Sequence, residues 1–130
     1  MKTVLTFGTF DVFHVGHIRI LQRASALGDT LIVGVSTDEM NLNKKGRYPI
    51  YNQEDRMMII NSLRYVNYCF EEESLDKKEE YLKYYKADVL VMGDDWKGKF
   101  DHFDKICEVI YLPRTPSVST TEIIEVINAR

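Results

Sequence analysis

The sequence lacks several features that point to particular classes of protein. No apolar run approaches the ~20 residues that a transmembrane helix needs, and the N-terminus does not resemble a signal peptide. Cys69 and Cys107 are the only cysteines, and they lie far apart in apolar contexts. This pattern favours buried, reduced thiols over a disulfide framework. We therefore expect a cytoplasmic protein that does not insert into a membrane.

An excess of basic residues is also missing. The formal net charge of −3 argues against non-specific binding of nucleic acid. Any phosphate must therefore be bound by local groups of basic residues. The chain of 130 residues, with 45% hydrophobic and 28% charged residues, is long enough for one core but not for two. We expect residues 1–130 to form a single domain.

Two common phosphate-binding motifs are absent. The sequence contains no GxxxxGK[ST] pattern, and no GxGxxG pattern follows the first apolar segment. Their absence argues against a P-loop kinase and against a dinucleotide-dependent dehydrogenase. No serine or cysteine is evidently paired with a base as a nucleophile. Direct displacement at phosphorus therefore fits better than covalent catalysis.

The most informative stretch present is Thr6 to Leu21, TFGTFDVFHVGHIRIL. An apolar run stops at Gly8, a short polar loop follows, and an amphipathic segment begins at His17. This order predicts a strand, a loop and a helix, with His14 and His17 at the helix N-terminus. Free backbone N–H groups and the helix dipole make such a place suitable for phosphate. The alternatives are two ordinary polar histidines or half of a metal site.

The rest of the chain repeats this alternation. A strand over 2–7, a helix over 17–27 ended by Gly28, and a strand over 30–35 form a βαβ unit, which implies parallel strands. Further strands are expected over 65–70, 88–92 and 108–112. We predict an α/β fold: a single-domain, Rossmann-like, doubly wound sheet that is mostly parallel. Ligands of such sheets bind beyond the carboxyl ends of the strands, where the two histidines fall.

A basic connection follows the second strand. Residues 36–51 are polar and contain Lys44, Lys45 and Arg47 around Gly46. They form either a solvated loop or a mobile clamp that closes over phosphates. Their place directly after a strand, on the same sheet edge as the histidines, favours the clamp.

A second phosphate-binding helix N-terminus is expected near the end of the chain. Ser119 and Glu122 fit a capping box that opens a helix over 120–128. The box does not account for the three successive hydroxyl residues that begin at Ser119, or for Arg114 before them. Hydroxyl and backbone donors at a helix N-terminus again suit phosphate, and two such sites would accommodate a triphosphate.

Three further charged positions have two interpretations each. Arg64, at the end of a helix over 52–63, either complements the helix dipole or points into the nucleotide site. Asp94 and Asp95 follow a buried strand, where they either hold a metal or shape the loop.

Four segments carry a resemblance to a known family. They are GTFDVFHVGH at 8–17, RYV at 64–66, MGDDWKGKFD at 92–101 and YLPRTPSVSTT at 111–121. Together they resemble the cytidylyltransferase-like nucleotidyltransferases with an HxGH motif, in particular the members that act on glycerol 3-phosphate in bacterial teichoic-acid synthesis. The resemblance implies the nucleotidyltransferase type of Rossmann-like fold and transfer of CMP from CTP to a polyol phosphate, above all sn-glycerol 3-phosphate. It also implies Mg²⁺ bound with CTP, and a homodimer.

The resemblance also implies roles for individual residues. The expected catalytic residues are His14, His17, Lys44 and Arg114. The expected CTP-binding residues are Gly8, Thr9, Phe10, His14, Val15, Gly16, His17, Lys45, Arg47, Arg64, Arg114, Thr115, Ser119, Thr120 and Thr121. Lys44 and Lys78 are expected at the acceptor phosphate. Asp11, Asp94 and Asp95 are candidates for loop or metal support, and no metal ligand is firmly assigned.

The chain departs from the family pattern near the acceptor. Its basic loop reads Lys44-Lys45-Gly46-Arg47, so either Lys45 or Arg47 replaces the second loop lysine, and Leu75 stands where the family has tryptophan. The alternatives are therefore a related nucleotidyltransferase with another base or acceptor, or a non-catalytic nucleotide-binding module. Release of pyrophosphate would distinguish the two alternatives, because an enzyme releases it and a binding module does not. The presence of both HxGH histidines counts against the binding module.

Overall fold

Five parallel strands form one sheet in the computed structural model, which describes residues 1–114 and 119–130. The strand order is β3-β2-β1-β4-β5, and each neighbouring pair is parallel. The strands are β1 (Thr3–Gly8), β2 (Thr30–Ser36), β3 (Tyr68–Glu72), β4 (Val89–Gly93) and β5 (Glu108–Leu112). The predicted α/β fold with a Rossmann-like sheet is confirmed.

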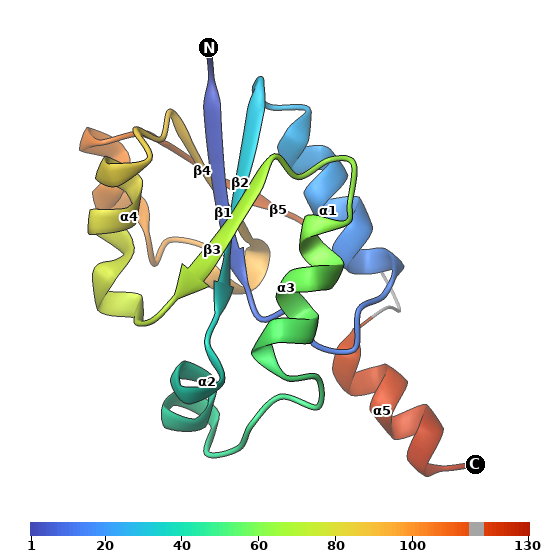
Figure 1. Ribbon diagram of the computed structural model, residues 1–130. Helices are drawn as coiled ribbons and strands as arrows, with labels where there is room; N and C mark the ends of the chain where they lie inside the picture. The colour runs from blue at the N-terminus through green and yellow to red at the C-terminus, as the bar shows by residue number, and fades with distance from the viewer. Residues whose placement is uncertain (115–118) are drawn as a thin grey trace.

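Helices cover both faces of the sheet (Figure 1). One face carries α1 (Val15–Ser25) and α3 (Gln53–Asn61), and the other carries α4 (Lys78–Tyr84). Two more helices, α2 (Asp38–Lys45) and α5 (Thr120–Asn128), lie beyond the carboxyl ends of the strands. Short 3₁₀ turns complete the chain: η1 (Leu75–Lys77), η2 (Asp94–Trp96) and η3 (Asp101–Lys105). No helix among the described residues is long and apolar enough to cross a membrane.

The alternation of side chains along β1 divides the core into two halves. Val4 packs in a cluster with Leu21 of α1, whereas Leu5 packs with Leu82 of α4. Residues on both faces of β1 are therefore buried, as expected for a parallel sheet covered by helices. The order of strands reverses between β1 and β4, and the space beyond their carboxyl ends is where a ligand of this fold binds.

Two details of the predicted elements are wrong. Helix α1 ends at a C-cap on Ala26, and Gly28 is not a left-handed C′ residue. A Cβ at Gly28 would lie 2.7 Å from the carbonyl oxygen of Lys2, so glycine is needed there for close approach to β1. The connection over 36–51 contains α2, which is capped by the Thr37 hydroxyl and ended by Gly46 in the left-handed conformation. Only residues 47–51 stay irregular before the cap of α3.

The close packing at Gly34 gives a test of the core. A Cβ there would lie 2.5 Å from Cδ1 of Phe7 and 2.9 Å from Cζ of Phe70. Because ring atoms inside a packed core cannot move freely, we expect Gly34→Ala to lower the free energy of unfolding by about 1–3 kcal/mol. Urea unfolding measures the change.

Gly93→Ala is the matched control for this prediction. A Cβ at Gly93 would meet nothing within 4 Å, and its φ of −72° suits any residue. Equal stability of the two variants would contradict the packing described at Gly34.

Candidate functional site

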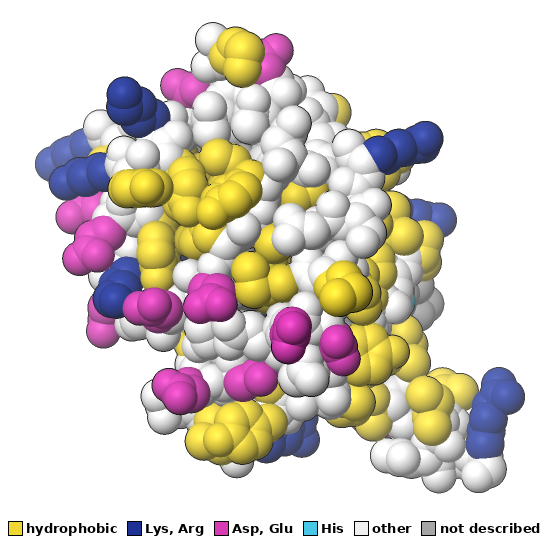
Figure 2. All heavy atoms as spheres, viewed as in Figure 1, with side chains coloured by type: hydrophobic (Ala, Val, Ile, Leu, Met, Phe, Trp, Pro, Cys, Tyr) yellow, Lys and Arg dark blue, Asp and Glu magenta, His cyan; other side chains and the backbone are white. Residues whose placement is uncertain are grey.

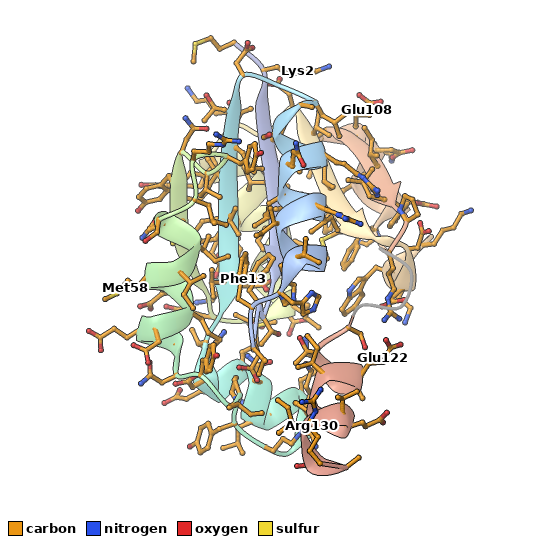
Figure 3. The ribbon with its side chains drawn as sticks, turned by 90° about the vertical axis from the view of Figure 1, so that its right-hand side faces the viewer. Lys2, Phe13, Met58, Glu108, Glu122 and Arg130 are labelled. Carbon is orange, nitrogen blue, oxygen red and sulfur yellow. The ribbon has the colours of Figure 1, made fainter. Side chains whose placement is uncertain are left out.

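A cleft of about 1030 Å³ lies beyond the carboxyl ends of β1 and β4. The structure brings most of the predicted site residues to its walls: Gly8, Thr9, Phe10, Asp11, His14, Gly16, His17, Lys45, Arg47, Asp95, Arg114, Ser119, Thr120 and Thr121. The cleft thus combines the N-terminus of α1, the end of α2 and the N-terminus of α5. In Figure 3, Glu122, which lines the cleft, lies far from Lys2, the residue just before β1.

A second hollow, of about 820 Å³, lies between α3 and the end of β3. Its lining includes the carboxylates of Asp38, Glu54 and Glu71 and no lysine or arginine. Figure 2 shows acidic side chains gathered on the lower half of this face. Negative charge makes the second hollow unsuitable for a triphosphate, so the cleft is the candidate site.

The two histidines form a reciprocal cap at the start of α1. His14 is the N-cap, and its Nδ1 accepts a hydrogen bond from the Gly16 amide at 3.0 Å. Nδ1 of His17 accepts from the His14 amide at 3.2 Å, and the two rings stack with centroids 3.9 Å apart. Because each Nδ1 is an acceptor, the hydrogen of each neutral ring must lie on Nε2. The cap therefore determines the tautomer of both imidazoles.

Both imidazoles are also held neutral. Burial, and then the neighbouring His14, lowers the pKa of His17 to about 4, although the charge of Asp11 opposes the change. Burial, and then the charge of Arg114, lowers the pKa of His14. At neutral pH the pair consequently offers two uncharged Nε2–H donors. Such donors can bind phosphate oxygens without first losing or gaining a proton.

The loop between β1 and α1 has a strained backbone. Phe10 has φ of 54° and Val12 has φ of 46°, both in the left-handed region that side chains with a Cβ rarely adopt. The Phe10 ring is buried and lies edge-on to His17, with centroids 5.5 Å apart. Strain of this kind persists only where surrounding contacts hold it, and it is concentrated at functional sites.

A closed ring of hydrogen bonds supports the loop from below. The Ser36 hydroxyl donates to Thr9 Oγ1, Thr9 donates to Asn41 Oδ1, and Asn41 Nδ2 donates back to Ser36. Ser36 and Asn41 are each 1% exposed. These three side chains join the ends of β1 and β2 to α2, so the position of Thr9 is determined by buried groups.

Arg56 of α3 is the site-supporting residue that the sequence analysis missed. Its side chain is 0% exposed, and its Nη1 donates to the carbonyl oxygens of Thr9 at 2.9 Å and Ser36 at 2.8 Å. Nε donates to the Tyr51 carbonyl, and Nη2 pairs with Asp38 at 2.6 Å. Within the charged sequence QEDR an arginine is typical of a solvent-exposed helix face, so no local signal could have identified it.

The N-terminus of α5 is the second helix N-terminus that lines the cleft, after that of α1. Ser119 Oγ accepts from the Glu122 amide, and the Thr120 hydroxyl donates to the Asp11 carbonyl at 2.8 Å. Arg114 is half-exposed, with Nη1 4.0 Å from Oδ1 of Asp95. This arrangement leaves the Arg114 guanidinium accessible to a ligand. Thr115 lies outside the described residues.

The two lysines expected at an acceptor are in different environments. Lys44 is exposed at the end of α2, with Nζ 5.6 Å from the Trp96 ring centroid. Lys78 is 1% exposed, and its Nζ lies 2.8 Å from Oε2 of Glu72 and 3.6 Å from the Phe7 ring centroid. Burial is the main cause of its lowered pKa, which Glu72 opposes. Lys78 is therefore buried against Phe7, is not among the residues that line the cleft, and already has a counter-ion.

Five of the predicted residues within the described chain are not among those that line the cleft: Lys44 and Lys78, and also Arg64, Val15 and Asp94. Arg64 is exposed against Tyr65 before the start of β3, at the amino end of the sheet. Val15 is 45% exposed in the first turn of α1. Asp94 is exposed in η2, next to Asp95, which does line the cleft.

The carboxylates near the cleft do not form a protein metal cage. Over residues 1–114 and 119–130, no group of three or more His, Cys, Asp or Glu could hold a metal ion. Both oxygens of Asp11 accept hydrogen bonds from backbone amides. Besides Asp11, the carboxylates on the cleft wall, among the described residues, are those of Asp95, Glu122 and Glu125, and all three residues are exposed. Because they form no cluster that could hold a metal ion, Mg²⁺ suits the cleft only if it is bound mainly by substrate phosphates and water.

The comparisons with known proteins agree with this geometry. A family model described as cytidylyltransferase-like matches residues 5–126. The chain is 48% identical over 125 residues to the glycerol-3-phosphate cytidylyltransferase of Bacillus subtilis, covering 96% of each chain. It is 47% identical to that of Staphylococcus aureus, covering 95% of this chain and 92% of the other. A lipopolysaccharide core biosynthesis protein from Thermoplasma volcanium has a similar structure, with a TM-score of 0.79 and 26% identity over 88% of this chain and 98% of the other.

The lowered pKa of His17 predicts a specific dependence of stability on pH. Between pH 6.5 and about 4 the unfolded chain binds a proton at His17 and the folded chain does not. Stability therefore falls as the pH falls through this window and is complete above it. In His17→Asn the amide Oδ1 can replace Nδ1 as the cap acceptor, and the titrating group is absent.

From pH 7 to pH 5 we expect wild type to lose on the order of 2 kcal/mol more stability than His17→Asn. Urea unfolding at both pH values measures the difference, with His102→Asn as a control for an exposed histidine. Parallel losses in wild type and His17→Asn would show that His17 is not held neutral by the fold.

Proposed function

The chain belongs to the cytidylyltransferase-like family, and on that premise we propose that it transfers CMP from CTP to sn-glycerol 3-phosphate. It is a nucleotidyltransferase, and the products are CDP-glycerol and pyrophosphate. The observation that carries the proposal is the pair of neutral Nε2–H imidazoles at the N-terminus of α1, opposite Arg114 and the N-terminus of α5. CDP-glycerol would serve as a precursor of a cell-envelope polymer such as teichoic acid.

The reaction needs no general base. An oxygen of the acceptor phosphate, largely dianionic at neutral pH, attacks the α-phosphorus of CTP. The new P–O bond forms as the bond between the α-phosphorus and the bridging oxygen breaks, and pyrophosphate leaves with its electron pair. The Nε2–H groups of His14 and His17 would donate to phosphate oxygens whose charge changes in the transition state. Alignment and these fixed donors then supply the catalysis.

Cations at both ends of the cleft would hold the triphosphate. Arg114, with the hydroxyls and amides at the start of α5, would hold one end. Lys45 and Arg47 both line the cleft at the end of α2, so both are candidates for the second loop cation of the family. Burial, and then the charges of Lys44 and Arg47, lowers the pKa of Lys45. A bound anion would relieve this crowding of positive charge.

Magnesium fits the site only as an ion carried by the nucleotide. The family generally uses Mg²⁺ with a nucleoside triphosphate, and we propose that Asp95, exposed on the cleft wall, would supply a carboxylate to it here. The ion would neutralise charge on the triphosphate. We also propose that residues 1–130 form one catalytic domain that acts as a cytoplasmic homodimer. Apolar side chains on α5 support the dimer, since Val126 and Ile127 are more than half exposed.

The acceptor phosphate would bind on the side of the cleft formed by Trp96. Lys44 is exposed there and can contact the phosphate directly. Lys78 would first have to exchange the carboxylate of Glu72 for the phosphate. Arg64 and Val15 remain proposed CTP-binding residues that the described cleft does not include.

A screen of pyrophosphate release tests the function. Four nucleoside triphosphates are crossed with glycerol 3-phosphate, ribitol 5-phosphate and phosphocholine. We expect release with CTP and glycerol 3-phosphate, and a loss in kcat on the order of 10²-fold in His17→Asn. Preference for another acceptor would overturn the substrate assignment. CTP binding by calorimetry without release from any pair would identify a non-catalytic module.

Arg114→Ala tests the part of the site formed by Arg114 and the start of α5. Loss of a charge-assisted contact to phosphate should weaken CTP binding about 10–100-fold. Isothermal titration calorimetry measures the affinity, and Arg19→Ala, at an exposed arginine of α1 away from the cleft, is the control. Unchanged affinity in folded Arg114→Ala would place this guanidinium outside the site.

A further inference from the structure

The carboxylate of Asp11 accepts three backbone hydrogen bonds. Oδ1 accepts from the Val12 amide at 3.0 Å and from the Tyr51 amide at 2.8 Å, and Oδ2 accepts from the Ile50 amide at 2.7 Å. Val12 belongs to its own loop, whereas Ile50 and Tyr51 are about 40 residues away along the chain. Asp11 therefore connects the loop after β1 to the segment over 47–51, which we call the strap.

The strap has few other attachments. Besides the two amides on Asp11, its hydrogen bond within the described chain is from Arg56 Nε to the Tyr51 carbonyl. Tyr48 is 60% exposed and Ile50 is 62% exposed, so burial of their side chains contributes little to its position. Arg47, Tyr48, Pro49 and Ile50 nevertheless all line the cleft. Two of the three described hydrogen bonds that hold the strap are thus accepted by the Asp11 carboxylate.

The backbone around Asp11 is held by contacts of its own. Its carbonyl accepts the Thr120 hydroxyl at 2.8 Å, and its neighbour Val12 is kept in the left-handed region. The residue consequently joins three segments that line the cleft: the loop after β1, the strap and the start of α5. Each of these segments contributes a cation, an imidazole or hydroxyls to the site.

We propose that Asp11 is a positioning residue, a latch that holds the strap against the cleft, so that Arg47 of the strap faces the triphosphate beside Lys45 at the end of α2, and that it is not a magnesium ligand. The part that concerns the triphosphate rests on the proposed function. A magnesium ion at Asp11 would have to displace backbone amides that have no other acceptor among the described residues. An unpaired amide at this position would offset any gain from the metal.

Asp11→Asn is the sharpest test because it changes one acceptor into a donor. The amide Oδ1 can still accept, but the NH₂ group must then face an N–H of the strap. In the full chain without ligand, we expect hydrogen exchange at the amides of Ile50 and Tyr51 to become at least tenfold faster. Exchange in β1 and β4 should not change. Asp29→Asn is the matched control, since that carboxylate accepts the Lys2 amide at the opposite end of the sheet.

Binding measurements separate a latch from a metal ligand. The latch predicts that Asp11→Asn weakens CTP binding about tenfold in calorimetry, equally with and without Mg²⁺. Ile50→Pro removes an amide of the strap and leaves the carboxylate intact, so it should weaken CTP binding by a similar factor. Unchanged exchange at Ile50 and Tyr51 in Asp11→Asn would overturn the latch. A loss of CTP affinity confined to solutions with Mg²⁺ would overturn it in favour of a metal ligand.

The exchange experiment does not depend on catalysis. If wild type releases no pyrophosphate with any acceptor, the proposed function fails, while the exchange rates of the strap still decide whether Asp11 holds it.

Discussion

The cleft depends on one buried charge, the guanidinium of Arg56. A cation with no solvent exposure must find acceptors for its N–H groups in the protein, because desolvation is otherwise too costly. Arg56 finds them on Thr9, Ser36, Tyr51 and Asp38, at the ends of β1 and β2, the end of the strap and the start of α2. The loop after β1, the junction of β2 with α2, and the strap are separated from one another in sequence. Satisfying the guanidinium brings them to one place.

The cleft contains two kinds of hydrogen-bond donor, which differ in charge: neutral imidazoles and cationic side chains. The histidines are half-buried at a helix N-terminus, and burial lowers the pKa of each, so they are neutral at pH 7 and donate from a determined nitrogen. The fixed positive charges come from more exposed residues, Lys44 and Arg114 among them. In the proposed reaction, cations at the rim would attract the highly charged nucleotide, and uncharged donors would contact the phosphate oxygens. This division suits a displacement whose charge moves between phosphate oxygens.

Many residues of the candidate site could be predicted from the sequence. The prediction failed for residues whose role depends on burial. His14, His17 and Arg114 follow from helix N-termini that are visible in the local pattern, and they do line the cleft. Arg56 was missed because its acceptors are backbone carbonyls on other segments, which no local pattern encodes. Lys78 was expected at an acceptor, yet the packing of Phe7 over it was not foreseeable.

By itself, the sequence determined the parallel α/β fold and the helix N-termini that are candidates for binding phosphate. Both arise from interactions between residues a few positions apart: apolar periodicity, capping and the backbone donors of a helix. Only the tertiary structure decided which charges are buried and paired, as at Arg56, Lys78 and Asp11, and that Arg64 lies at the opposite end of the sheet. Ionisation and hydrogen bonding of those groups depend on desolvation by distant segments, and this exists only once the chain has folded.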